Sequence, residues 1–140
     1  PVAFDCMSGA EGLDAEGLTQ RESALIRDLT LLLGNEVKIA TTLVQVPVFA
    51  GLGAALSIET ERDLEVGEAE DLFRKAPGVE IVDDSDDFPT TRTVVGRDSV
   101  CVGRLRGDPS TERGLQLWLV ADPMRLAASH AIQLAVLRLA

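Results

Sequence analysis

Three segments of this 140-residue chain have the pattern of β-strands with apolar side chains on both faces. They are residues 41–49, 99–106 and 115–121, and the neighbouring pairs Leu43 with Val44, Val100 with Cys101 and Trp118 with Leu119 show the pattern. A sheet that is apolar on one side needs a single layer of helices, whereas a sheet that is apolar on both sides needs a second cover. We therefore expect a two-fold dimer, in which a second copy of the chain supplies the second cover.

Helical patterns alternate with the strands. Thr19 followed by Glu22 is a capping-box signature, and Gly34 after an apolar stripe is a typical helix end. The predicted elements are a helix at 19–33, a strand pair over 37–60 around a Gly-rich turn, a helix at 63–76, strands at 79–82, 99–106 and 115–121, and a helix at 124–139. This order indicates an α+β fold, with a largely antiparallel or mixed sheet covered by helices on one face.

The composition is that of one globular domain with a strong negative charge. Hydrophobic residues make up 46% and charged residues 26%, and the formal charge is −10. This charge argues against nucleic acid and against anionic membrane surfaces as partners, because both bind basic patches. We expect no membrane-spanning helix, no signal peptide and no metal site, and we interpret Cys6 and Cys101 as free thiols in the cytoplasm.

Two short motifs invite a ligand-binding interpretation that their details weaken. Gly51-Leu52-Gly53 opens like a dinucleotide-binding fingerprint, but no third Gly or helix follows, so a Gly-rich turn is favoured. The acidic run DDSDDF lacks the central Gly and the closing Glu of a calcium loop, so a solvated acidic turn is favoured for Asp83, Asp84, Asp86 and Asp87.

Three basic side chains are candidates with simpler alternatives. Arg104 and Arg106 share one predicted strand, where they either form cross-strand ion pairs, the favoured interpretation, or bind an anion. His130 is the only histidine, and it lies either on the surface of the last helix or beside a group that would make it a base or a ligand.

Longer stretches are similar to aspartate-semialdehyde dehydrogenases. Residues 41–60, TTLVQVPVFAGLGAALSIET, resemble the family's C-V-R-V-P-V-x-x-G-H-S-E. Residues 89–108, PTTRTVVGRDSVCVGRLRGD, resemble its Y-P-T-P and G-x-D-x-V-x-V-G-R-I-R, and residues 114–122, GLQLWLVAD, resemble G-L-N-L-W-V-V-S-D. PVAFD at the start resembles P-I-A-F-N, and the helix at 19–33 stands where the family has T-K-E-E-x-K. The order is the family's own, so the chain resembles the C-terminal dimerisation domain of that family.

The resemblance implies a reaction whose polar side chains are replaced here. In the family, NADPH reduces aspartyl phosphate to aspartate semialdehyde through a thioacyl enzyme on a Cys, beside a His that moves protons. That His position holds Leu52, and the Arg that grips the substrate carboxylate is Gln45. The family's substrate-holding Glu and Lys fall on Arg21 and Ala24. We expect no intact catalytic or substrate-binding residue, and His130, near the family's cofactor, is the one cofactor-binding candidate.

Two functions remain open at this point. The first is the dimerisation domain of a degenerate member of this amino-acid biosynthetic family, a pseudoenzyme that binds no cofactor itself although NADP is expected for the family. The alternative is part of a working NAD(P)-dependent oxidoreductase with an altered acyl substrate. It would take its catalytic Cys and its cofactor domain from a missing N-terminal half, and a Cys in the upstream sequence would favour it.

We expect residues 1–140 to form a single dimerisation domain that is a fragment, because the sequence opens on Pro1 without Met. The last helix, at 124–139, is apolar nearly all round, and surface helices normally have a wide polar face. The resemblance implies that this helix packs against the missing nucleotide-binding domain. Ala127, Ala131 and Leu134 should then contact another chain or stay accessible.

Overall fold

The computed structural model describes residues 6–8, 12–82 and 88–139, and the chain divides into two compact units, Pro1–Pro47 and Val48–Ala140. Helices combine with a two-stranded and a four-stranded sheet, which confirms the predicted α+β class. The acidic run at 83–87 lies outside the described residues, so its interpretation as a solvated turn stays a prediction.

The first unit is organised around the N-terminus of its helix. It contains β1 (Met7–Ser8), α1 (Gln20–Leu33) and β2 (Val44–Gln45), and β1 pairs with β2 in antiparallel fashion. The capping box is confirmed, because the Thr19 hydroxyl accepts the Glu22 N–H at 3.2 Å and the Glu22 carboxylate accepts the Thr19 N–H at 2.7 Å. Gly34 ends the helix at a φ of 94°, and its N–H donates to the Thr30 carbonyl.

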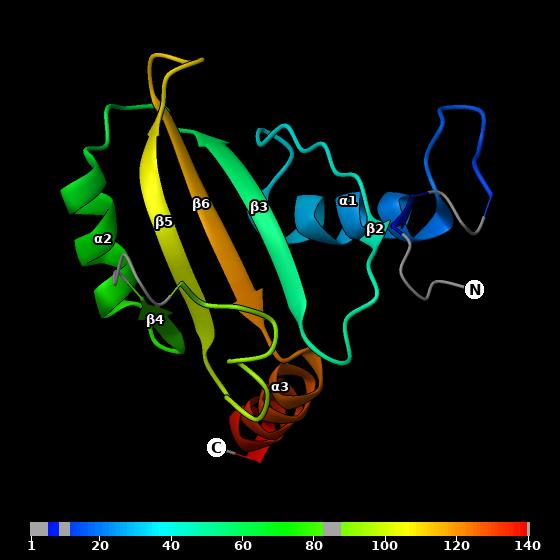
Figure 1. The fold of residues 1–140 in the computed structure, drawn as a ribbon. Coiled ribbons are helices and arrows are strands. Elements are labelled where there is room, and N and C mark those ends of the chain that lie inside the picture. Colours follow the sequence, from blue (N-terminus) through cyan, green and yellow to red (C-terminus); the bar gives the residue numbers. More distant parts are fainter. Residues whose placement is uncertain (1–5, 9–11, 83–87, 140) are drawn as a thin grey trace. The chain divides into compact units, whose positions relative to one another are not determined.

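The second unit is built on a mixed sheet with the strand order β3-β6-β5-β4, shown in Figure 1. Its strands are β3 (Leu52–Glu59), β4 (Val79–Ile81), β5 (Val100–Asp108) and β6 (Gly114–Ala121). β6 lies antiparallel between β3 and β5, and β4 runs parallel to β5. Helix α2 (Val66–Lys75) packs against β4 and β5, and α3 (Pro123–Leu139) leaves the end of β6.

The strand pair predicted over residues 37–60 is wrong. Residues 37–43 are not a strand, β2 pairs with β1, and β3 pairs with β6 from Leu52 opposite Ala121 to Glu59 opposite Gly114. β3 pairs with β6 because β6 runs alongside it for eight residues, so that apolar side chains of the two strands lie next to each other on the same face. A hairpin through Pro47 and the bend at 48–51 would not give β3 a partner of that length. The Gly-rich turn is partly right, since Gly51 lies in it at a φ of 93° while Gly53 belongs to β3.

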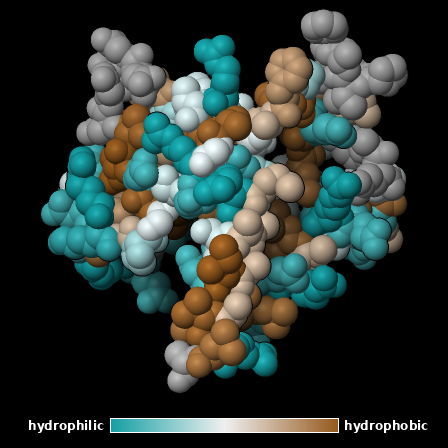
Figure 2. Space-filling view, turned by 90° about the horizontal axis from the view of Figure 1, so that it is seen from below, coloured by the Kyte–Doolittle hydropathy of each residue, from teal (hydrophilic) through white to brown (hydrophobic). Residues whose placement is uncertain are grey.

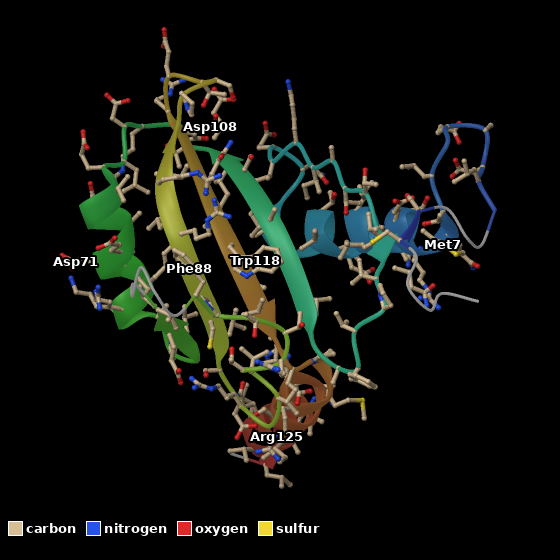
Figure 3. The ribbon with its side chains drawn as sticks, in the orientation of Figure 1. Met7, Asp71, Phe88, Asp108, Trp118 and Arg125 are labelled. Carbon is tan, nitrogen blue, oxygen red and sulfur yellow. The ribbon has the colours of Figure 1, made fainter. Side chains whose placement is uncertain are left out.

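One face of the sheet carries Trp118, and segment 88–98 of the same chain covers part of that face. Val94, in the segment 88–98, is 1% exposed and forms the buried core with Cys101 and Val120. The indole N–H of Trp118 donates to the Pro89 carbonyl at 2.9 Å, which holds this segment on the sheet (Figure 3). The expectation that a second copy supplies the whole second cover is therefore too broad, because segment 88–98 supplies part of it.

Close contacts explain the two neighbouring glycines, because Gly53 lies against the Trp118 ring and Gly51 lies against Thr91 of segment 88–98. A Cβ on Gly53 would lie 2.5 Å from the Trp118 ring, and a Cβ on Gly51 would lie 2.6 Å from the Thr91 carbonyl oxygen. Both positions are filled by the chain's own atoms, so this glycine pair serves packing and leaves no room for the phosphates of a dinucleotide.

Gly53→Val should destabilise the second unit, because the new side chain displaces the Trp118 ring. We expect a loss of about 1–3 kcal/mol in the free energy of unfolding, typical of overpacking in a closed site. Urea unfolding followed by the fluorescence of Trp118, the single tryptophan, measures it.

Gly67→Ala is the matched control. A Cβ at Gly67 in α2 meets nothing within 4 Å, so we expect stabilisation by about 0.5–1 kcal/mol, the usual advantage of Ala over Gly in a helix. Equal stability of the Gly53→Val variant and the parent chain would contradict the packing account.

Candidate functional site

Neither of the two residues that the resemblance places at catalytic positions, Gln45 and Leu52, is buried. Gln45 is an exposed residue of β2 opposite Met7, and Leu52 begins β3 opposite Ala121 with 49% of its surface exposed. The two lie in different compact units. The Leu52 side chain has no atom that accepts a proton, and Gln45 is neutral, so it cannot form the charge-assisted clamp of an Arg on a carboxylate.

The predicted substrate-binding positions stand on the first turns of α1, on both sides of Glu22. Arg21 is exposed and Ala24 half-buried, while Glu22 is buried at 4% exposure. The Glu22 carboxylate accepts three bonds, from the Thr19 N–H and hydroxyl at 2.7 and 2.9 Å and from the Leu43 N–H at 2.7 Å. The Thr19 N–H, then the Leu43 N–H, lower the pKa of Glu22 from 4.5. This carboxylate is committed to holding α1 and the chain before β2 together.

Helix α3 carries the cofactor-binding candidate His130 and is exposed along its length. No residue of α3 is buried, and His130 is exposed. Ile132 and Leu134 are each 65% exposed and Leu137 is 75% exposed. Figure 2 shows α3 as a brown and tan column that projects at the lower centre. The expected accessibility of Ala127, Ala131 and Leu134 is confirmed.

The start of α3 is fastened to segment 88–98, a contact that the sequence analysis missed. The Asp122 carboxylate accepts the N–H groups of Met124 and Arg125 as a helix cap, and also the Gly96 N–H at 2.9 Å. Hydrogen bonding by Gly96, and then by Arg125 and Met124, lowers the pKa of Asp122. Arg125 forms a two-pronged ion pair with Asp98 at 2.7 and 2.8 Å, at the position labelled in Figure 3. The dipeptide Asp122-Pro123 was the available signal, because Asp before Pro is typical of a helix start.

Beside segment 88–98, the described residues of the second unit leave a recess on the Trp118 face whose side chains are mostly small or polar. We call this the open patch: Ala55, Ser57, Arg104, Arg106 and Gln116, which line a recess of about 240 Å³ together with Trp118 and two leucines. It begins at a β-bulge between Gly103 and Arg106, where Arg104 takes a φ of 56°.

The predicted cross-strand ion pairs of Arg104 and Arg106 are not formed among the described residues. Arg106 donates to the Gln116 side chain at 2.5 Å and to the Arg104 carbonyl at 3.1 Å, and Arg104 lies 6.0 Å from the Phe88 ring centre. Hydrogen bonds from Ser110, and then from Gln116, lower the pKa of the Asp108 carboxyl, and the positive charge of Arg106 lowers it further. The partner of Arg106 across the strands is a neutral amide, and both arginines are exposed.

Among the described residues, no group of three or more His, Cys, Asp or Glu side chains could hold a metal ion. In the same part of the chain, no helix is both long and apolar enough to cross a membrane. Cys101 is buried and Cys6 exposed, and neither forms a disulfide in the described structure.

Comparison with known proteins decides the family. A model of the semialdehyde dehydrogenase dimerisation domain matches residues 11–126. The chain belongs to this family. Aspartate-semialdehyde dehydrogenase from Aquifex aeolicus is 34% identical over 97% of the chain and 41% of its own length. The chain thus spans about two-fifths of the length of the curated relatives it matches.

Solved structures agree with this assignment. Aspartate semialdehyde dehydrogenase II from Vibrio cholerae, in a complex with ASA, has a TM-score of 0.90 and 32% identity over 97% of this chain and 41% of that one. The Candida albicans enzyme, solved with NADP, has a TM-score of 0.65 at 16% identity over 83% of this chain and 43% of that one, a likeness of fold alone. The dimerisation domain is therefore the part of the semialdehyde dehydrogenase fold that this chain forms.

Glu22→Gln should destabilise the first unit of this semialdehyde dehydrogenase domain. One carboxylate oxygen becomes an NH₂ group, which then faces the N–H donor of Thr19 or of Leu43 without an acceptor. The lowered pKa means that ionised Glu22 stabilises the fold above pH 4.5 and that this contribution is lost as the pH falls through the folded-state pKa. We therefore expect a lower Tm at pH 7 and a smaller drop in Tm between pH 5 and about pH 3.

Glu16→Gln is the control for this measurement, because Glu16 is exposed and, among the described residues, only its backbone N–H forms a hydrogen bond, to the Asp14 carboxylate. Thermal unfolding of both variants, followed by far-ultraviolet circular dichroism, compares them. The same Tm change with pH in Glu22→Gln as in the parent chain would rule out the role given to Glu22.

Proposed function

We propose that this chain is the dimerisation domain of an aspartate-semialdehyde dehydrogenase-like protein that does not carry out the family reaction. The observation that carries the proposal is Leu52, which stands where the resemblance places the proton-transferring His. Gln45, Arg21 and Ala24 support it, since they replace a carboxylate clamp and two substrate-holding charges. Four changes at polar positions weaken substrate binding and proton transfer together.

The domain's own contribution is pairing with a second copy. The matching family is described as a dimerisation domain, and the open patch is a sheet surface that the described residues of the second unit leave as a recess. Sheet faces of this kind bury their side chains against another layer. A homodimer supplies that layer.

Helix α3 supports a second contact, with a nucleotide-binding domain. No residue of α3 is buried and most of its large apolar side chains are exposed, which is unusual for a surface helix of an isolated domain. The resemblance implies that this helix returns to the cofactor domain, where His130 would lie near NADP. The glycines at 51 and 53 are occupied by the chain's own packing, so we assign no cofactor site to the described residues themselves.

A chimera tests the loss of activity. Residues 1–140 replace the matching domain of the Aquifex aeolicus enzyme, and NADP-dependent turnover of aspartate semialdehyde is measured. We expect turnover to fall by about 10³-fold or more, since general acid–base catalysis alone contributes about 10²–10⁴-fold. Leu52→His with Gln45→Arg should restore a measurable part, and adding Arg21→Glu with Ala24→Lys should restore more.

The control chimera carries Leu72→His, which places an imidazole on the exposed side of α2 and should restore nothing. A folded parent chimera that turns over substrate as fast as the Aquifex enzyme would refute the proposed inactivity.

Light scattering on the purified chain tests the pairing. We expect the mass of a dimer at tens of micromolar, because an uncovered sheet face and a net charge far from zero favour one specific contact over general aggregation. A mass of one chain at that concentration would count against a homodimer.

A further inference from the structure

We propose that residues 96–99 form a clip that couples the first turn of α3 to the edge strand β4, so that the two are ordered or loosened together. The clip lies directly before β5 and is bonded to both elements. This inference goes beyond the proposed function, because it concerns how one contact of the second unit affects another and needs no dimer, cofactor or catalytic residue.

The α3 side of the clip consists of Gly96 and Asp98. The Gly96 N–H donates to the Asp122 carboxylate at 2.9 Å, and that carboxylate is also the cap of α3. The Nε and Nη2 atoms of Arg125 donate to the two Asp98 carboxylate oxygens at 2.8 and 2.7 Å. A two-pronged pair of this kind fixes the orientation of its two groups as well as their distance. The first turn of α3 is therefore held to the clip by a backbone donor and by a side chain.

The β4 side of the clip consists of Arg97 and Ser99, which both bind Glu80 in the middle of β4. Arg97 donates from Nη1 to one Glu80 carboxylate oxygen at 3.0 Å, and the Ser99 hydroxyl donates to the other at 2.7 Å. Successive residues of the clip thus bond alternately to α3 and to β4. Because Asp98 stands between Arg97 and Ser99, a backbone movement that releases it displaces both of its neighbours.

The register of the sheet explains why one short segment reaches both elements. Cys101 of β5 is opposite Val120 of β6 on one side and opposite Glu80 of β4 on the other. The start of β5 therefore lies between β4 and the end of β6, from which α3 leaves (Figure 1). Residues 96–99 lead into β5, so they lie at this same end of the sheet.

Strand β4 depends on such a contact because its own pairing is short. It has three residues and, among the described strands, pairs only with β5, in parallel. A short parallel edge strand has few ladder bonds, so it opens more easily than strands inside the sheet. Its flanking backbone bonds run from the Val100 N–H to the Gly78 carbonyl and from the Val82 N–H to the Val102 carbonyl, each at 2.8 Å. Loosening of the clip should therefore appear at these amides.

Amide hydrogen exchange of the purified chain, followed by NMR, tests the coupling from both sides. Arg125→Gln removes the ion pair between the clip and α3, and it should speed exchange of the Val82 N–H by about threefold or more. Glu80→Gln leaves one donor of the clip without an acceptor on β4. It should speed exchange of the Leu126 N–H, in the first turn of α3, by a similar factor, because coupling is reciprocal.

The double variant, Arg125→Gln with Glu80→Gln, should exchange at Val82 and Leu126 about as fast as either single variant, because each change alone already opens the whole clip. Independent contacts would instead multiply their effects, to about ninefold.

Arg62→Gln is the matched control. It removes another exposed ion pair of the second unit, that of Arg62 with Glu68 at 3.0 Å, which lies at the start of α2. Amides that exchange by unfolding of the whole unit respond to this loss, whereas amides that exchange by opening of the clip do not. We expect unchanged exchange at Val82 and Leu126.

Gly96→Ala tests the clip without a change of charge. Gly96 has a φ of 83°, which side chains disfavour, and a Cβ there meets nothing within 4 Å, so the substitution strains the backbone without a clash. It should speed exchange at both Val82 and Leu126 by about fivefold. Gly17→Ala, at a φ of 79° in the first unit with the same free space, should change neither.

Three results would overturn the clip. They are faster exchange only at the altered end in each single variant, multiplied effects in the double variant, and an equal response to Arg62→Gln. None of them bears on the proposed inactivity or on the proposed homodimer, because the measurement follows contacts within one chain.

Discussion

The packing of segment 88–98 on the sheet is the constraint on which the second unit depends. Val94, Cys101 and Val120 are the closely packed interior, and Trp118 closes it through its bond to the Pro89 carbonyl. A unit of this size has few helices and loops with which to cover both faces of its sheet. Gly53 is needed because the tryptophan ring takes the space of a side chain there.

The same segment fixes the start of α3. Asp122 caps the helix and accepts the Gly96 N–H, and Arg125 reaches Asp98. The cover of the sheet and the direction in which α3 leaves it are therefore set by one group of contacts. The open patch and α3 are both accessible among the described residues of the second unit, and we propose a different partner for each of them: a second copy and a nucleotide-binding domain.

The sequence predicted what local chemistry and alternation determine. The Thr19–Glu22 capping box, the Gly34 helix end and the exposure of α3 follow from short-range patterns, and the motifs at 41–60, 89–108 and 114–122 predicted the family. It could not predict that residues 37–43 avoid a strand or that segment 88–98 covers Trp118, because both depend on pairing between distant residues. The neutral partner of Arg106 was missed for the same reason, since a bulge shifts its register.

The central claim is that the open patch is buried between two copies, and chemical cross-linking across this patch tests it most directly. Gln116→Cys is made in a Cys6→Ser background, where Cys101 is only 1% exposed, and is treated with a bifunctional maleimide that spans about 10 Å, the distance between packed sheets. If two copies pair through the open patch, we predict a covalent dimer from Gln116→Cys at low protein concentration and almost none from Asp71→Cys on α2. Efficient cross-linking of Asp71→Cys with none at Gln116→Cys would contradict it.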